Sequence, residues 1–406
     1  MPMKYWFLDY RNTRFMFYIL FLSVFLAASA ATLQYVPLPF LWIALLSAGI
    51  FCFLAIKHKQ PSWRVLWINL ATVFITIGAL ELYFYSSEIV RMEGSYTDGY
   101  YADHQVLGYC PTAERESRAI KYHGKERVYD VNYTIDKRGL RISPPAQDSL
   151  ACGSVLFFGG SVTFGEGVED DQAMPYVTGM KTEGSYVNDN FGFHGYGPHQ
   201  MLAALELGIV DEVVSETVRH VIYQGIPAHV ARSAGRASWD RHGPKYILDS
   251  NGKPVYEGPF DGRLSRPVRW LRKQLDKSAL YRFSGTMQRE ATPEEIKLYT
   301  AIVAAARDTV NRKFPNAQFH VLLWGNQGEK TYDAILDGFS KAGMRVHLVN
   351  ENLPGYSQQP SSYEISPFDR HPNPHAHALI AEYVSARILH GGSCQHPAPL
   401  VVGATK

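Results

Sequence analysis

The sequence predicts an α/β domain built on a doubly wound parallel sheet of about five strands, preceded by three transmembrane helices. Three observations lead to this prediction. Apolar runs of membrane-spanning length fill the first 85 residues, and short apolar runs alternate with amphipathic ones after residue 150. A Gly-Gly-Ser turn follows the first of these short runs, where the carboxyl edge of a sheet would place a site.

The composition of the 406-residue chain limits the function classes. The net charge is +2 and charged residues make up 19%, so there is no overall basis for nucleic-acid binding. Aromatic residues make up 13%, which suits a membrane protein or a surface that faces carbohydrate. The four cysteines are too few for a disulfide scaffold. Cys110 and Cys152 could pair in an oxidising compartment, and two unpaired thiols are the alternative.

Three apolar segments within residues 1–85 approach the length that crosses about 30 Å of hydrocarbon as a helix. They are Phe15–Ala31, Phe40–Ile56 and Val65–Tyr85. Basic residues precede the first segment and separate the second from the third, so the positive-inside rule places the rest of the chain outside the cytoplasm. Ala28-Ser-Ala30 resembles a signal-peptidase site, and cleavage there would leave the main domain on the same side.

One carboxylate, Glu81, falls within the third apolar segment. An ionisable residue inside a membrane is a functional hypothesis by default. Because Glu81 is near the outer end of its segment, we expect it to reach the interface without a functional role. Residues 86–150 then predict a linker and a small β-rich lead-in, in which Val128–Ile135 alternates as a half-buried strand does.

The α/β core is predicted element by element from hydrophobic patterning. The strands are expected at Ser154–Phe158, Ser185–Asp189, Val218–Gln224, Gln318–Trp324 and Arg345–Val349. The helices are expected at Met201–Leu207, Pro293–Lys313, Lys330–Lys341 and Pro374–Leu389. Thr292 is a good N-cap for the longest of these helices, because a proline and two glutamates follow it.

Residues 228–291 are expected to form a long insertion in this core. Within it, Lys245–Leu248 and Pro254–Tyr256 flank a turn and predict a hairpin. Arg263–Arg282 is strongly basic, with apolar residues at helical spacing. This segment could meet anionic lipid head groups or an acidic glycan, or it could be a packed surface helix with solvated charges.

The residues that carry chemistry are Ser161, at the end of the first strand, and the pair Asp369 and His371, just before the last helix. A serine nucleophile needs a base, and the base needs a group that orients it. His371 is the candidate base and Asp369 its orienting carboxylate, with His371 in a loop that can face Ser161. His377 is a rival base inside the helix, and His375 is expected to be solvated.

Metal and cofactor sites are not expected. The chain has no Cys/His pairs at zinc-finger spacing and no His-Glu-x-x-His. It has no P-loop, and Gly165-Glu-Gly167 lacks the further spacing of a dinucleotide fingerprint.

Three ordered blocks resemble the SGNH (GDSL-like) hydrolase superfamily, in its membrane-tethered bacterial branch. The first block of that family runs Gly-Asp-Ser and often continues as Thr163–Val168 does here. The second fits Asn190–Gly197, and the last, with Asp and His before Pro-Asn, fits Asp369–Asn373. The resemblance covers roughly Val106 to Leu389.

This resemblance implies a flavodoxin-like α/β/α three-layer domain at 151–391, after a membrane domain (1–85) and a lead-in (86–150) and before a tail (392–406). It implies an esterase or O-acyltransferase that acts on acyl esters of surface polysaccharide or glycolipid, with the Ser161 and Gly192 amides as oxyanion donors. The partners would be an acylated carbohydrate or lipid substrate and envelope polysaccharide machinery, with no cofactor. The expected location is the bacterial inner membrane, with the catalytic domain facing the periplasm or cell exterior.

Two departures from the family pattern leave a second hypothesis open. Gly160 replaces the Asp of Gly-Asp-Ser, and Gly225–His229 lacks the Asn that serves the family as a third oxyanion donor. His229 or Asn326 could take that place. The alternative is a catalytically inactive SGNH-like domain that binds a glycan or scaffolds envelope assembly.

Overall fold

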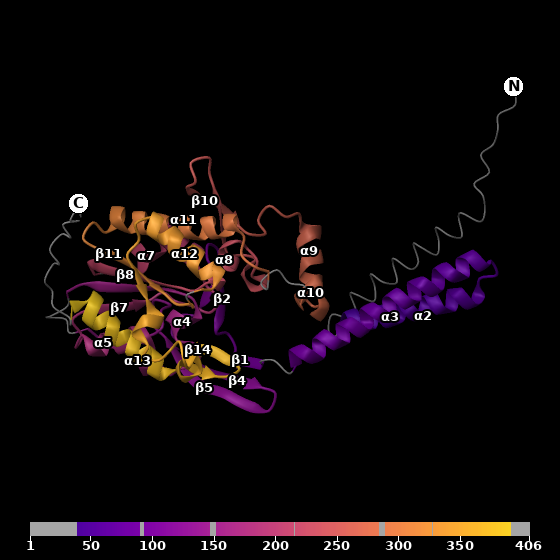
Figure 1. The fold of residues 1–406 in the computed structure, drawn as a ribbon, viewed down its shortest axis with the longest axis horizontal. Helices are drawn as coiled ribbons and strands as arrows, with labels where there is room; N and C mark the ends of the chain where they lie inside the picture. Colours follow the sequence, from indigo (N-terminus) through magenta and orange to yellow (C-terminus); the bar gives the residue numbers. More distant parts are fainter. Residues whose placement is uncertain are drawn as a thin grey trace, which may run out of the picture. The chain divides into compact units, whose positions relative to one another are not determined.

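The computed structural model describes residues 39–89, 93–146, 152–214, 216–283, 289–326 and 328–390. The chain divides into two compact units (Figure 1). The first contains the N-terminal residues to Arg91 together with Ser265–Gly285, and the second contains Met92–Leu264 and the residues from Thr286 onward. The first predicted span, Phe15–Ala31, and the tail, 392–406, lie outside the described residues.

Within its described residues, the first unit contains two helices long and apolar enough to cross a membrane. These are α2 (Pro39–Lys57) and α3 (Pro61–Ile89), with spans of mean hydropathy 2.2 and 1.9. They correspond to the second and third predicted segments. They pack against each other through aromatic rings, with Phe51 stacked on Trp67 at a centroid distance of 5.7 Å. Their orientation in a membrane stays a prediction.

We expected the side chain of Glu81 to reach the membrane interface. Instead, Glu81 is buried and only 1% exposed. Its Oε2 accepts hydrogen bonds from Ser278 Oγ (2.7 Å) and the Leu280 amide (3.1 Å), and its Oε1 accepts one from the Ala279 amide (2.8 Å). These donors begin α10 (Ala279–Phe283), which packs on α3. A carboxylate therefore caps the first turn of α10, where exposed N–H groups favour negative charge.

The capping predicts a local effect of Glu81→Ala. Buried donors left without an acceptor cost about 1–3 kcal/mol each, and each 1.4 kcal/mol changes an equilibrium about tenfold. We therefore expect trypsin to cut the basic helix α9 (Arg266–Leu275) and α10 at least about tenfold faster in the detergent-solubilised variant. Glu81→Gln keeps one acceptor oxygen and should fall between. Equal cleavage of all three proteins would contradict the capping role.

The second unit is built on a five-stranded parallel sheet with the order β12-β11-β8-β6-β7. The strands are β6 (Ser154–Gly159), β7 (Val187–Asn190), β8 (Val218–Gly225), β11 (Gln318–Leu323) and β12 (Val346–Leu348). Each lies within about two residues of a strand predicted from the sequence. The prediction of a parallel sheet of about five strands is thus confirmed.

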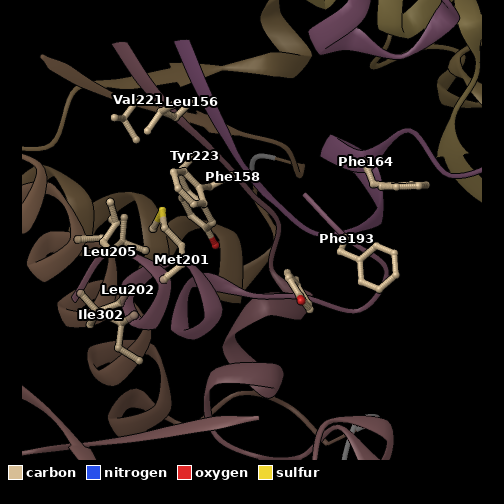
Figure 2. Packing of buried hydrophobic residues seen from close by; sticks show 14 of the residues in the cluster. Leu156, Phe158, Phe164, Phe193, Met201, Leu202, Leu205, Val221, Tyr223 and Ile302 are labelled. Atoms are coloured by element: carbon tan, nitrogen blue, oxygen red, sulfur yellow. The ribbon is translucent and has the colours of Figure 1, made fainter. Parts of the chain in front are cut away.

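Both faces of this sheet are buried, which explains why its strands read as continuous apolar runs. In β6, Leu156 and Phe158 join the cluster that contains Met201 (Figure 2). Val155 and Phe157 join the cluster on the other face, which contains Ile380. The first face is covered by α6 (Pro198–Glu206) and α11 (Pro293–Lys313), and the second by α5 (Met174–Lys181) and α13 (Pro374–Tyr383).

The helix boundaries follow local signals in the sequence. Thr292 Oγ1 accepts from the Glu295 amide at 3.3 Å, and Glu295 Oε2 accepts from the Thr292 amide at 2.9 Å. This capping box begins α11 at the predicted residue. The last predicted helix, Pro374–Leu389, is α13 continued by a π-helical turn at Val384–Ile388. The helix α12 (Lys330–Lys341) has its predicted bounds.

The lead-in forms a small antiparallel sheet in the order β1-β4-β5. Its strands are β1 (Glu93–Tyr96), β4 (Arg115–His123) and β5 (Glu126–Ile135), beside a hairpin of β2 (Tyr101–His104) and β3 (Gly108–Pro111). Alternate residues of β5 are buried, as the pattern predicted. The predicted hairpin of the insertion is β9 (Pro244–Leu248) paired with β10 (Pro254–Pro259). Cys110 is free and Cys152 is disulfide-bonded, so these two cysteines are not paired with each other.

Candidate active site

Ser161 begins a four-residue helix, α4 (Ser161–Phe164), directly after β6. The turn into α4 depends on two glycines. Gly159 has φ of +156°, and a Cβ there would lie 2.1 Å from Thr163 Oγ1. A Cβ on Gly160 would lie 2.9 Å from the Tyr196 carbonyl oxygen and 2.7 Å from Arg232 Nη1. The turn thus holds Ser161 at the carboxyl edge of the sheet, where ligands of open α/β sheets bind.

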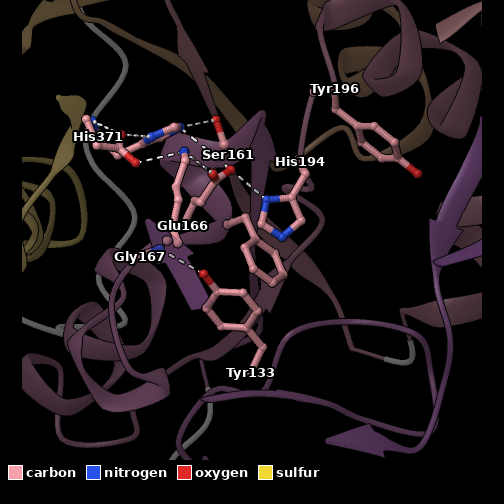
Figure 3. A network of polar contacts seen from close by, with 12 residues as sticks. Tyr133, Ser161, Glu166, Gly167, His194, Tyr196 and His371 are labelled. Atoms are coloured by element: carbon pink, nitrogen blue, oxygen red, sulfur yellow. Dashed lines mark hydrogen bonds and ion pairs between the residues drawn. The ribbon is translucent and has the colours of Figure 1, made fainter. Parts of the chain in front are cut away.

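The structure joins Ser161, His371 and Asp369 by hydrogen bonds. Figure 3 shows His371 beside Ser161. His371 Nε2 lies 2.8 Å from Ser161 Oγ, and His371 Nδ1 lies 2.5 Å from Asp369 Oδ1. Asp369 and His371 come from a short strand, β14 (Asp369–Pro372), rather than from the predicted loop. The strand pairs with β13 (Glu364–Ser366) just before α13 begins, which fixes the direction of the imidazole.

The charges around these three residues favour an ionised carboxylate and a basic imidazole. Burial alone would raise the pKa of Asp369, but the hydrogen bond and charge of His371 and the charge of Lys121 bring it to about 2. Burial lowers the pKa of His371, but the charge of Glu166 and the bond to Asp369 outweigh burial, so its pKa lies above the usual value. Asp369 is therefore ionised across the range in which His371 changes its charge.

A second set of charged groups, which no motif in the sequence indicates, lies next to these three residues. Lys121, from β4 of the lead-in, donates to Asp369 Oδ2 at 2.8 Å and to Glu166 Oε1 at 3.2 Å. Glu166 Oε2 lies 2.7 Å from His194 Nδ1 and 3.7 Å from His371 Nε2. His194 Nε2 in turn lies 3.0 Å from Tyr100 Oη. The lead-in therefore contributes a cation to the site.

Glu166, Asp369 and His371 offer ligand atoms within 4.8 Å of one another, and such a group can hold a metal ion. The ammonium group of Lys121 already lies between the two carboxylates and would repel a divalent cation. Burial would raise the pKa of Glu166, but His371, His194 and Lys121 hold it well below the usual value. The carboxylates are thus balanced by protein cations, which favours acid–base chemistry over metal binding at these residues.

We expect Lys121→Met to move the acid limb of the pH–activity profile upward by about one pH unit, because a charge within about 4–6 Å shifts a pKa by this order. The positive charge of Lys121 lowers the pKa of His371. Without it the imidazole loses its proton at higher pH, and only the unprotonated ring can act as the base. Measuring kcat/KM against pH tests this, with the exposed Lys341→Met as the control. A uniform loss of rate with an unmoved limb would contradict it.

The predicted oxyanion donors differ in their surroundings. Among the described residues, none accepts a hydrogen bond from the Ser161 amide. The Gly192 amide donates to Asn190 Oδ1 at 3.0 Å, and a Cβ on Gly192 would lie 2.7 Å from the Phe164 amide nitrogen. Gly192 therefore packs against α4, and its amide would have to leave Asn190 before it could bind an oxyanion.

Of the other predicted site residues, His229 lies beside the turn that precedes Ser161, and the rest make contacts elsewhere in the unit. His229 is buried, with Nε2 3.1 Å from the position of a Cβ on Gly160. Asn326 donates to Glu329 Oε1 at 2.8 Å and lines a separate pocket of about 620 Å³. His377 Nδ1 accepts from the Met174 amide, and burial lowers the pKa of His377 to about 3. The ring of His375 stacks on Tyr363.

Comparison of the sequence with family models and with curated proteins finds no match. Among solved structures, the chain is similar to LAE5, an alpha/beta hydrolase enzyme from the metagenome of Lake Arreo, Spain. That match has a TM-score of 0.33 and 17% identity, and covers 60% of this chain and 96% of the other. The chain is also similar to an acetyl xylan esterase (Est2A) from the rumen bacterium Butyrivibrio proteoclasticus, with a TM-score of 0.31 and 13% identity over 74% and 84% of the two chains. TM-scores this low do not establish a shared fold, so function must be inferred from the site.

Proposed function

We propose that this protein is a membrane-anchored serine esterase or O-acyltransferase of the SGNH type. The observation that carries the proposal is the line from Ser161 Oγ through the imidazole of His371 to the Asp369 carboxylate. A hydroxyl, a base and a carboxylate at these distances can perform acyl transfer. The strand order β7-β6-β8-β11-β12 supports the finer fold assignment, because it corresponds to the 2-1-3-4-5 order of flavodoxin-like sheets.

In the proposed reaction, Ser161 Oγ attacks the carbonyl carbon of an acyl ester while His371 Nε2 takes the hydroxyl proton. Asp369 holds the ring so that Nδ1 keeps its proton and the imidazolium is stabilised. The alcohol leaves with the proton from His371, and the acyl group stays on Ser161. Water or a sugar hydroxyl then attacks the acyl-enzyme and regenerates the serine.

The acyl acceptor and the location belong to the same proposal. The substrate is an acylated surface polysaccharide or glycolipid, and the catalytic unit faces the periplasm or cell exterior beside envelope polysaccharide machinery. Two helices of membrane-spanning length support an anchor. A reporter fused after Lys406 that is active only in the cytoplasm would contradict this orientation.

The test is to incubate the purified full-length protein with an activated acyl ester, with and without a glycan acceptor. We expect release of the alcohol in both cases, and acylated glycan in the second case if the protein is a transferase. A fluorophosphonate should label Ser161, since it forms a stable bond to an activated serine. A folded protein that neither reacts with the ester nor takes the label would contradict the proposal and favour the inactive glycan-binding alternative.

A further inference from the structure

A buried guanidinium group without an anionic partner lies beside the candidate nucleophile. Arg232, in α8 (Ala228–Ser233), is 9% exposed. Its Nη1 donates to the Tyr196 carbonyl oxygen at 2.7 Å, and its Nε is buried without a hydrogen-bond partner. None of the ion pairs found in the described part of the chain includes Arg232. Burial lowers the pKa of Arg232, and the charges of Asp240 and Glu166 act on it without forming an ion pair, so a direct anionic partner would stabilise the guanidinium.

The surroundings of Arg232 show where that anion would lie. Arg232 Nη1 and His229 Nε2 are 2.7 Å and 3.1 Å from the position of a Cβ on Gly160, the residue before Ser161. The two residues are three apart on α8 and face the same turn. His229 Nε2 is a second buried nitrogen without a partner, and His229 Nδ1 lies 2.7 Å from Tyr223 Oη. Tyr223 Oη has one proton, which it can donate to His229 Nδ1 or to Tyr299 Oη at 3.4 Å. When it donates to Nδ1, the shorter contact, the ring proton of His229 is on Nε2 and points toward the turn.

We propose that Arg232, with His229 as a second donor, binds an anionic oxygen of the substrate beside Ser161. This inference rests on the proposed acyl-transfer function. That oxygen has two sources. It is the oxyanion formed when the Ser161 Oγ–carbon bond forms and the carbonyl π electrons move onto oxygen, or it is a fixed carboxylate or phosphate on the substrate. Guanidinium recognises either of them through charge-assisted hydrogen bonds.

The same arrangement accounts for the two departures from the family pattern. A carboxylate at position 160 would lie against Arg232 and neutralise it, whereas Gly160 leaves the charge available. The missing third-block Asn removes one neutral donor, and α8, which follows directly on that loop, supplies a charged donor instead. Arg232 thus supplies a hydrogen-bond donor in place of the third-block Asn that the resemblance led us to expect.

Binding of methylphosphonate, a tetrahedral anion, tests the site without requiring turnover. The exposed indole of Trp239 lies 5.9 Å from the Arg232 guanidinium and should report binding by its fluorescence. We expect the full-length protein to bind methylphosphonate and Arg232→Gln to bind it at least about tenfold more weakly. Arg118→Gln, a surface arginine on β4, is the matched control and should bind as wild type. Should Arg232→Gln not fold, Arg232→Lys decides, because lysine keeps the charge but loses the planar fork and should also bind about tenfold more weakly.

Kinetics distinguish the two sources of the anion. If the anion is the oxyanion, Arg232→Gln should lower kcat by about 10²–10³ for the neutral ester p-nitrophenyl acetate, with little change in KM. If it is a fixed charge, KM should rise for mono-p-nitrophenyl succinate alone. Unchanged methylphosphonate binding and unchanged kinetics for both esters would overturn the inference and leave the proposed function standing. If methylphosphonate binding depends on Arg232 but the protein reacts with neither ester, the anion site stands and the proposed function is overturned.

Discussion

Ser161→Ala is expected to abolish ester turnover, with a loss of about 10⁶-fold, while leaving the protein folded. Ser161 Oγ lies 2.8 Å from His371 Nε2, so its proton can pass to this base as the oxygen attacks a carbonyl carbon. Alanine is compatible with the first position of α4 and removes no packing group. In Ser161→Ala, turnover of an activated ester should therefore be lost, whereas the midpoint of thermal unfolding should stay close to that of the wild type.

The matched control for this experiment is Ser340→Ala on the exposed face of α12, which should retain full activity. Residual turnover in Ser161→Ala within tenfold of wild type would mean that another group is the nucleophile. Loss of activity together with loss of folding would show instead that the hydroxyl is a structural group. The proposed role of Ser161 is supported only if Ser161→Ala loses activity and keeps its fold.

Asp369→Asn is expected to reduce kcat by about 10⁴, as the corresponding change does in serine-protease triads. The amide has the same shape, but its NH2 group favours the His371 tautomer whose lone pair is on Nδ1, so Nε2 can no longer take the serine proton. The change also removes the anion that pairs with Lys121 at 2.8 Å. The rate should be measured with the unfolding midpoint, with the exposed Asp337→Asn as the control.

A cellular experiment separates the enzyme from the inactive glycan-binding alternative. A binding domain needs neither a nucleophile nor a particular imidazole tautomer. If Ser161→Ala and Asp369→Asn both complement a deletion strain as well as wild type, the catalytic hypothesis is wrong. If both fail while the proteins reach the membrane in normal amounts, glycan binding alone does not account for function.

The sequence predicted those parts of the molecule that local patterning determines. The core strand β6 is buried on both faces and therefore shows as an uninterrupted apolar run, and α11 begins at a capping box that can be read directly. Glycine and proline residues mark the turns around Ser161, Asp369 and His371, so these three residues could be predicted from the sequence. Their short distances could only come from the fold.

The parts that were missed depend on contacts between distant segments. Lys121 meets Asp369 across 248 positions of the chain, and nothing near Lys121 marks it as different from other lysines on a polar strand. Glu81 meets Ser278 across 197 positions, so the sequence showed an acid within an apolar segment but not its partner. Arg232 was passed over because a buried, unpaired cation can be recognised only when its neighbours are known.

The position of the Arg266–Leu275 and Ala279–Phe283 helices in the same compact unit as α3 has a consequence for handling the protein. The chain passes between the two units at three places, after Arg91, after Leu264 and after Gly285. A soluble version that starts at Met92 would keep α10 but lose the carboxylate that caps it, leaving the amides of Ala279 and Leu280 without their acceptor. Production of the second unit alone therefore calls for removal of residues 265–285 together with α2 and α3.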